Sequence, residues 1–182
     1  MERIMVVGIS AGVGKSTFAR RLGNILDIEV THLDSLFWKP GWVEANLEEF
    51  SALQREIVKK PQWIMEGNYS QTFELRLQHA DTIIYLELPL YVCLYRVLKR
   101  WLTNLGKTRP DMGKGCKEQM EWGFLKFIIT TYHARRSKME ERMDRFQELG
   151  SEKKVFKLRS KREIASFLER MREEGRVNGV VS

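Results

Sequence analysis

Apolar residues follow two different spacings along the chain, and the alternation between them predicts strands separated by helices. Short apolar runs predict five strands, at residues 4–7, 28–33, 63–65, 82–88 and 154–158. Apolar residues three and four positions apart predict helices, at about residues 16–26, 47–60, 73–77, 91–102, 118–149 and 161–171. Strands that alternate with helices are joined by right-handed crossovers, so the pattern predicts an α/β fold around a five-stranded parallel sheet.

Local sequence signals define several of these boundaries. Pro61 follows the second helix, and a proline ends a helix because it lacks the backbone N–H that the helix needs. Ser160 and Glu163 have the spacing of a capping box, which begins the last helix. Residues 133–137 are mostly polar, and they predict a break in the long helix that exposes the two arginines within this stretch.

The chain has the length and composition of one α/β domain. Its 182 residues are 43% hydrophobic, which is enough to build a core. There are only four prolines and no repeat, so no linker divides residues 1–182. A polar stretch at 103–115, rich in glycine and lysine, predicts a lid that closes over bound nucleotide, within a lid region of about 103–136. Residues 175–182 are expected to form a frayed tail.

The stretch from Gly8 to Thr17, GISAGVGKST, carries the strongest chemical signal in the chain. It joins the first predicted strand to the first predicted helix, and such a loop turns several backbone N–H groups toward phosphate oxygens at a helix N-terminus. Lys15 would reach the outer phosphates of ATP as a positive charge, and the Ser16 hydroxyl would ligate Mg²⁺. The predicted nucleotide-binding residues of the loop are Gly12, Val13, Gly14, Lys15, Ser16 and Thr17.

One position of this loop departs from the Walker A pattern. The pattern places its first glycine at position 9, where the chain has Ile9, and Gly8 stands one residue too early. Either the loop is longer by one residue, or Gly12 and Gly14 supply the backbone freedom that the turn needs. A glycine-rich turn that binds nothing is the weaker interpretation, because Gly-Lys-Ser-Thr stands where a strand meets a helix.

Side chains suited to binding an acceptor follow the second and third predicted strands. Asp34 comes at the end of the second strand, and Glu66 and Asn68 follow the third. Because the carboxyl ends of parallel strands meet at the ligand-binding edge of an open α/β sheet, these groups should lie beside the loop. The aromatic segment of residues 37–42, which includes Trp38, is either a wall of the acceptor pocket or an apolar cover over the sheet edge.

The net charge of +7 admits two kinds of partner, nucleic acid and polyphosphate. The basic residues are spread along the chain, and no helix-turn-helix, zinc-finger or RNA-binding motif accompanies them, so DNA binding has no support from a motif. His32, His79 and His133 show no spacing typical of a catalytic triad or a metal site, which predicts structural or surface roles.

Neither cysteine usage nor hydropathy points to secretion or to a membrane. Cys93 and Cys116 lack the spacing of metal ligands, which predicts reduced thiols. The N-terminal apolar run is too short for a signal peptide, and no segment approaches the length that spans a bilayer. We therefore expect a cytoplasmic location and no membrane partner.

With these elements in order, the chain resembles the adenylate-kinase-like P-loop kinases, and within them the group labelled DNA topology modulation protein, or FlaR-like. The resemblance covers about residues 1–172 and rests on residues 8–17, 32–42, 63–69 and 85–89 together with Arg96 and Arg100. It implies a three-layer P-loop NTPase fold, in which helices flank the five-stranded parallel sheet and a helical lid covers the site.

The resemblance also implies roles for single residues. In such kinases an arginine that opens the lid helix lies over the adenine and another, four residues later, contacts phosphate, which places these roles on Arg96 and Arg100. This spacing puts both side chains on one helix face. Asp34 stands where the family's aspartate touches the acceptor or the metal. Glu66 stands where related chains often have aspartate, so it is an alternative base or metal-shell group.

These observations lead to the hypothesis of ATP-dependent phosphoryl transfer to a small molecule, such as a nucleoside, a nucleotide or another hydroxyl compound. Lys15 and Arg100 would stabilise the developing charge, and Asp34 would orient or deprotonate the acceptor hydroxyl. The predicted acceptor-binding residues are Asp34, Trp38, Glu66, Asn68, Arg109, Arg135 and Arg136.

Two other functions stay open as alternatives. One is a nucleotide-switched regulator that binds DNA, and the other is a P-loop NTPase without a small-molecule acceptor. A GTPase is disfavoured, because the Asn-Lys-x-Asp guanine signature is absent from the chain. Nothing in the sequence identifies the acceptor or the oligomeric state.

Overall fold

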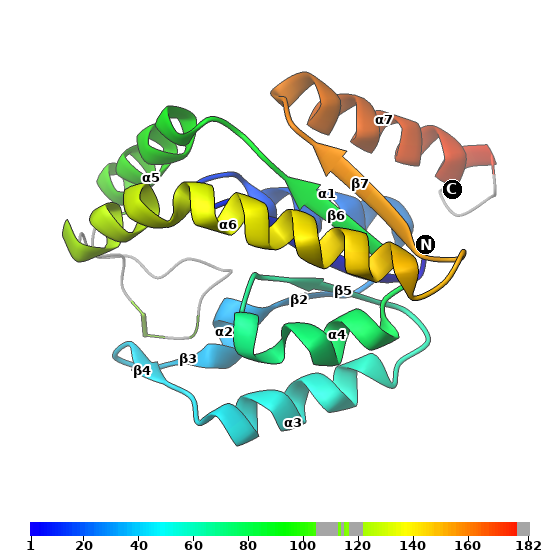
Figure 1. Ribbon diagram of the computed structural model, residues 1–182, viewed down its shortest axis with the longest axis horizontal. Helices are drawn as coiled ribbons and strands as arrows, with labels where there is room; N and C mark the ends of the chain where they lie inside the picture. The colour runs from blue at the N-terminus through cyan, green and yellow to red at the C-terminus, as the bar shows by residue number, and fades with distance from the viewer. Residues whose placement is uncertain (105–112, 114, 117–121, 178–182) are drawn as a thin grey trace.

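A five-stranded parallel sheet forms the centre of the computed structural model, which describes residues 1–104, 113, 115–116 and 122–177 (Figure 1). The strands run in the order β2-β5-β1-β6-β7. Their bounds are Arg3–Gly8 for β1, Val30–His32 for β2, Trp63–Glu66 for β5, Thr82–Leu86 for β6 and Lys154–Leu158 for β7. Every pairing in this sheet is parallel, so the carboxyl ends of the strands meet at one edge, as the sequence predicted.

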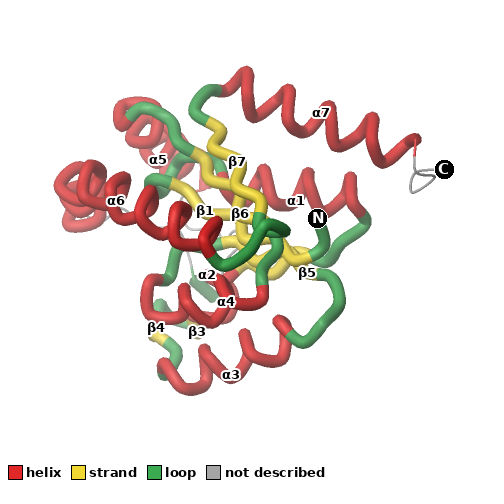
Figure 2. The backbone as a smooth tube through the Cα atoms, turned by 45° about the vertical axis from the view of Figure 1, so that its right-hand side comes forward, coloured by secondary structure: helices red, strands yellow, loops and turns green. Residues whose placement is uncertain are grey.

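Helices cover both faces of the sheet, which gives the three layers of the predicted fold. Helices α1 and α7 pack against each other on one face, while α4 and α6 cover the other (Figure 2). The helix bounds are Lys15–Leu26 for α1, Leu47–Val58 for α3, Phe73–His79 for α4, Leu90–Asn104 for α5, Trp122–Glu148 for α6 and Lys161–Val177 for α7. Because both faces are covered, the three central strands β5, β1 and β6 are mostly apolar and buried, and in β1 every residue after Arg3 is buried.

Helix α6 shows that the predicted break at residues 133–137 is wrong, because the helix runs without interruption from Trp122 to Glu148. Its buried residues keep helical spacing on both sides of the polar stretch: Leu125, Ile128, Tyr132, Met139, Met143 and Phe146. The apolar stripe lacks one turn, where Arg135 and Arg136 stand. Packing before and after this turn holds it in helical geometry, so one polar turn does not end the helix.

The chain between β2 and α3 is more structured than the sequence predicted. Strand β2 ends at His32, and the next residue begins a short helix, α2, Leu33–Phe37. Asp34 therefore lies in the first turn of that helix, directly beyond the carboxyl end of the strand. The aromatic segment that follows contributes to an antiparallel hairpin of β3, Trp38–Lys39, and β4, Val43–Glu44.

The last helix begins as predicted and ends later. The backbone N–H of Glu163 donates to the Ser160 hydroxyl oxygen at 3.1 Å, which is half of the predicted capping box. The helix then continues to Val177, beyond the predicted end at Met171. Ion pairs between charged side chains one turn apart support this extension.

Two predictions fall partly outside the described residues. Residues 105–112 and 114 belong to the expected lid, and they include Arg109. Residues 178–182 belong to the expected tail. Within the described part of the chain, no helix combines the length and the apolar character needed to cross a bilayer.

Candidate functional site

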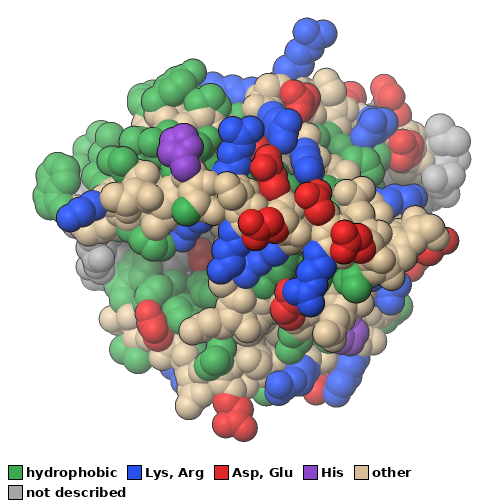
Figure 3. Space-filling view, in the orientation of Figure 1, with side chains coloured by type: hydrophobic (Ala, Val, Ile, Leu, Met, Phe, Trp, Pro, Cys, Tyr) green, Lys and Arg blue, Asp and Glu red, His purple; other side chains and the backbone are tan. Residues whose placement is uncertain are grey.

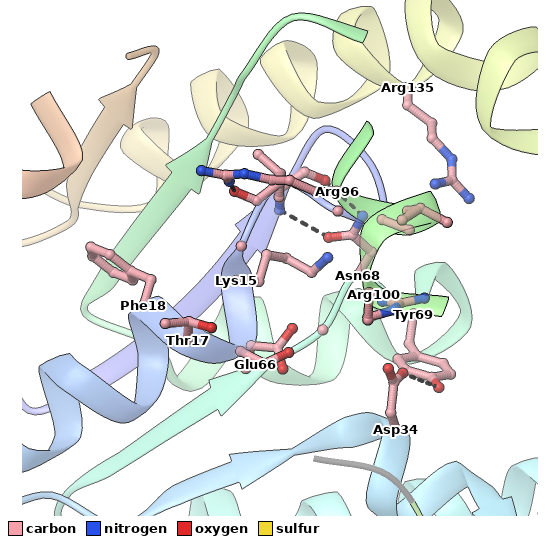
Figure 4. A pocket seen from close by; sticks show the side chains of 18 of the residues that line it. Lys15, Thr17, Phe18, Asp34, Glu66, Asn68, Tyr69, Arg96, Arg100 and Arg135 are labelled. Atoms are coloured by element: carbon pink, nitrogen blue, oxygen red, sulfur yellow. Dashed lines mark hydrogen bonds between the residues drawn. The ribbon is translucent and has the colours of Figure 1, made fainter. Parts of the chain in front are cut away.

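A cavity of about 1360 Å³ opens at the carboxyl edge of the sheet (Figure 4). The loop after β1 and the residues that follow β2 and β5 form one side of it, and helices α5 and α6 line the other. Of the predicted site residues that the structure describes, all but Arg136 line this cavity: Gly12, Val13, Gly14, Lys15, Ser16, Thr17, Asp34, Trp38, Glu66, Asn68, Arg96, Arg100 and Arg135.

The conformation of the glycine loop depends on Gly12 and Gly14. Their φ angles are +78° and +103°, which side chains with a Cβ rarely adopt. A Cβ on Gly12 would lie 2.3 Å from the backbone oxygen of Cys93, so the loop also packs tightly against α5. Ile9 is buried, and its N–H donates to the Leu86 carbonyl at 2.9 Å. These contacts favour the second alternative for the loop, in which Gly12 and Gly14 supply the backbone freedom.

The same loop presents several hydrogen-bond donors at the start of α1. Among the described residues, none accepts a backbone hydrogen bond from the N–H groups of residues 10–16. Lys15 begins the helix, and its Nζ lies 3.4 Å from the Ser10 carbonyl oxygen. A Cβ on Gly8 would lie 3.0 Å from two carbons of the Lys15 side chain, so this glycine leaves room for the lysine. Free N–H groups, a helix N-terminus and a cation together fit a polyphosphate.

Asn68 supports the loop from the neighbouring strand. Its side-chain oxygen accepts from the N–H of Gly8 at 3.0 Å, and its side-chain nitrogen donates to the Gly8 carbonyl at 2.7 Å. Both ends of the amide are therefore engaged with the end of β1. The structure gives Asn68 a part in holding the phosphate loop, whereas the sequence predicted a contact with the acceptor.

Arg76 supports the site from behind the cavity wall, and the sequence did not predict this role. It is fully buried, and its guanidinium donates to the carbonyl oxygens of Gly67, Asn68 and Tyr69 at 2.9, 3.2 and 3.1 Å. Burial, followed by the nearby charge of Arg142, lowers the pKa of Arg76 to about 9. The signal in the sequence was its position on the apolar face of a short helix, where a charged residue must find internal partners.

Two acidic side chains lie beside the loop, and each has a fixed neighbour. Glu66 and His32 are register partners in adjacent parallel strands, and His32 Nδ1 lies 2.8 Å from Glu66 Oε2. Their side chains are only 5% and 12% exposed, so this pair is largely shielded from water. His32, for which the sequence predicted a structural or surface role, therefore contacts a predicted site residue.

Asp34 is held by Tyr69, as Figure 4 shows. The Tyr69 hydroxyl donates to Asp34 Oδ1 at 2.6 Å. Burial, together with the charge of Asp34, raises the pKa of Tyr69 far above its ordinary value, so the phenol stays a hydrogen-bond donor. The Tyr69 ring packs against Phe37 and Phe50, with ring centroids 4.9 Å apart in both pairs, which fixes the hydroxyl in place.

Cationic side chains of α5 and α6 lie opposite these carboxylates. Arg96 donates to the Val13 carbonyl at 2.8 Å, so it covers the phosphate loop directly. Arg100 lines the cavity one turn later, on the same face of α5. Arg135 reaches the cavity from α6, and its guanidinium lies 4.4 Å from the centre of the Phe127 ring.

Arg136 points elsewhere, contrary to its predicted role in acceptor binding. Its Nε lies 3.0 Å from Glu87, a residue that is 8% exposed at the end of β6. Arg159 contacts the same carboxylate at 3.4 Å. Neighbouring positions on a helix point about 100° apart, so Arg135 and Arg136 cannot both face the cavity.

The parallel sheet, the glycine loop and the helix that begins at Lys15 define a three-layer α/β P-loop fold. Solved structures with this fold include a shikimate kinase from Acinetobacter baumannii in complex with shikimate. That protein is 14% identical, with 98% of this chain and 94% of that chain covered and a TM-score of 0.53. A gluconokinase from Sinorhizobium meliloti is 16% identical, with 95% and 94% covered and a TM-score of 0.50.

These similarities establish the P-loop fold that kinases use. No protein-family model matches the chain, and no curated protein sequence matches it. The comparisons do not confirm the narrower resemblance to the FlaR-like group.

Proposed function

We propose that the protein transfers the γ-phosphate of ATP to a small-molecule hydroxyl acceptor. One observation carries this proposal: Lys15, Asp34 and Arg100 line a single cavity. A phosphoryl donor site, a carboxylate and a cation opposite it are the parts that in-line phosphoryl transfer requires. The similar structures support this class, since one is a shikimate kinase with shikimate bound and another is a gluconokinase.

The nucleotide half of the cavity would hold ATP by its phosphates. Backbone N–H groups of residues 12–17 surround them, and Lys15 places its charge on the outer ones. Arg96 covers the loop and would lie toward the adenine, and Arg100 would contact a phosphate, as the resemblance implies.

A magnesium ion fits the residues present. The Ser16 hydroxyl lines the cavity together with the carboxylates of Asp34 and Glu66, and hydroxyl and carboxylate oxygens are the ligands that Mg²⁺ prefers. The ion would neutralise charge on the phosphates when bound. His32 holds Glu66 in one orientation, which makes this carboxylate a defined partner for the magnesium shell.

The acceptor half would hold the hydroxyl in line with the γ-phosphate. Asp34 accepts the hydroxyl proton as the acceptor oxygen bonds to phosphorus and ADP leaves. Tyr69 keeps Asp34 in place by its hydrogen bond. Trp38 lines this half, which supports a wall of the acceptor pocket over an apolar cover. A cytoplasmic location belongs to the same proposal, since ATP is available there and both cysteines are free.

The experiment that tests this function is a screen for ATP consumption over hydroxyl compounds, run beside calorimetry of ATP with Mg²⁺. Lys15→Ala should remove most ATP binding and all transfer, because it deletes the charge on the outer phosphates. Lys126→Ala is the matched control, since Lys126 is exposed on α6 and does not line the cavity. Unchanged ATP affinity in a folded Lys15→Ala protein would refute the nucleotide site.

The alternative of a DNA-binding regulator is tested in the same preparation. Filter binding of duplex DNA at rising salt would detect it, because phosphate contacts weaken steeply with salt. Specific, nucleotide-dependent DNA retention without any acceptor turnover would replace the kinase proposal.

A further inference from the structure

We propose that the acceptor is an anion, a hydroxyl compound that carries a carboxylate or a phosphate group, and that a row of cations on α6 binds this group. The row consists of Arg135, Lys138 and Arg142, and all three line the cavity. This inference rests on the proposed phosphotransferase and narrows its substrate. It excludes neutral nucleosides and neutral sugars as acceptors.

The spacing of the row places its charges along one side of the cavity. Positions i, i+3 and i+7 share one face of a helix, and the row extends about 10 Å along α6. Figure 4 shows Arg135 pointing from α6 toward the part of the cavity where Tyr69 and Asp34 lie. An acceptor that reaches both sides would place its hydroxyl at Asp34 and its anionic group on α6.

The three cations of the row form no ion pair with a carboxylate among the described residues. Two other cations of this helix have carboxylate partners, since Arg136 pairs with Glu87 and Arg145 pairs with Glu74 at 3.2 Å. Figure 3 shows side chains of both charges gathered on the outer surface over α6. The charge of Glu74 acts on Arg142, although the two side chains form no ion pair within 4 Å.

The three side chains of the row differ in the contacts that they already make within the protein. Lys138 has no hydrogen-bond or ion-pair partner among the described residues. Arg142 contacts the Ser70 hydroxyl at 3.4 Å and the face of Phe73 at 4.1 Å, which holds its guanidinium in position. Arg135 rests on Phe127, and burial lowers its pKa. Arg135 and Arg142 are partly buried, whereas Lys138 is exposed, so an anionic ligand would offset a burial penalty at the two arginines.

Carboxylates also line the cavity, on elements other than α6, and they affect how an anionic acceptor is oriented. Asp34, Glu44 and Glu66 line the cavity away from α6. An anionic group is repelled by these carboxylates and attracted by the row, which favours an orientation with that group on α6 over one with that group beside Asp34. In that orientation the hydroxyl lies at Asp34, where the proposed transfer needs it.

The first experiment compares matched acceptors and matched variants in the ATP-consumption screen. Each carboxylate acceptor is compared with the corresponding amide, and each phosphate ester with the corresponding free alcohol. The carboxylate and the phosphate group are thereby tested separately. Lys138→Gln should raise the KM of the anionic acceptor about 10-fold, because losing one hydrogen bond between charged groups weakens binding by about this factor. The KM of ATP should stay unchanged. Lys138→Arg should restore the acceptor KM, and Lys126→Gln should leave both values at the wild-type level.

The second experiment needs no turnover. Inorganic phosphate and acetate are titrated into Lys15→Ala protein, in which the loop site is disabled, and tryptophan fluorescence reports binding near Trp38. The row is supported if adding Lys138→Gln to the Lys15→Ala protein weakens this binding at least 10-fold and adding Lys126→Gln leaves it unchanged. Turnover of neutral acceptors alone, or equal anion binding in all variants, overturns the inference and leaves the kinase proposal intact. Loss of ATP binding by the wild-type protein would instead refute the proposed function itself.

Discussion

The two halves of the cavity are built in different ways. The phosphate loop of the proposed nucleotide half comes from one continuous stretch, Gly8 to Thr17, and most of its donors are backbone N–H groups. The acceptor half comes from side chains on elements far apart in the chain, among them Asp34, Glu66 and Arg135. Backbone groups are present whatever the residue type, so we expect this loop to tolerate Ile9 in place of a glycine. The second half depends on the identity of each side chain and on what holds it.

Loop geometry should matter more than any single side chain, so Gly12→Ala is expected to have the largest effect. A Cβ there meets the Cys93 carbonyl, and the positive φ adds about 1–3 kcal/mol of strain. We expect ATP binding to be lost in calorimetry. Gly41→Ala is the control, because Gly41 has a similar φ of +79° with nothing within 4 Å of the added Cβ. Normal ATP affinity in Gly12→Ala would contradict a backbone-built site.

In the acceptor half the largest effect is expected from Asp34→Asn. The change keeps size and hydrogen bonding and removes the charge, so transfer should fall by about 10²–10⁴-fold while ATP affinity stays constant. Steady-state rates at saturating ATP and acceptor, with calorimetry of ATP, measure the two. A wild-type rate would make Asp34 structural and leave Glu66 as the carboxylate that handles the proton.

Arg76→Met tests the residue that joins the two halves. Three backbone carbonyls of residues 67–69 would lose their partner, which should lower the free energy of unfolding by about 3 kcal/mol. Because Asn68 in this segment holds Gly8, ATP affinity should fall as well. Arg145→Met, which removes an exposed ion pair, should lower stability by less than about 1 kcal/mol. Urea denaturation compares the two, and equal stability losses would exclude the linking role.

The smallest effect is expected for Tyr69→Phe. The ring packing against Phe37 and Phe50 is kept, and only the hydrogen bond to Asp34 is lost. Transfer should slow about 10-fold, which corresponds to one hydrogen bond to a charged group, with no change in ATP affinity. Single-turnover rates measure this effect. An unchanged rate would show that Asp34 keeps its position without Tyr69.

The sequence by itself determined the five strands of the central sheet and the phosphate loop, but not helix α2 or the hairpin of β3 and β4. The loop is a local motif, since Gly12, Gly14 and Lys15 act within one turn of chain, and local motifs are visible without tertiary contacts. The strands were visible because a parallel sheet buries both faces and requires continuous apolar runs. The predicted break in α6 was wrong because its polar turn is held by packing on either side, which no local pattern reveals.

Only the tertiary structure decided which side chains reach the acceptor half. Arg135 and Arg136 are adjacent in the sequence, yet one lines the cavity and the other pairs with Glu87 at the end of β6. His32 meets Glu66 because strand register sets them side by side, and register depends on residues 34 positions apart. These contacts arise when whole helices and strands pack together. The type and spacing of residues along the sequence indicate only the helix or strand to which those residues belong.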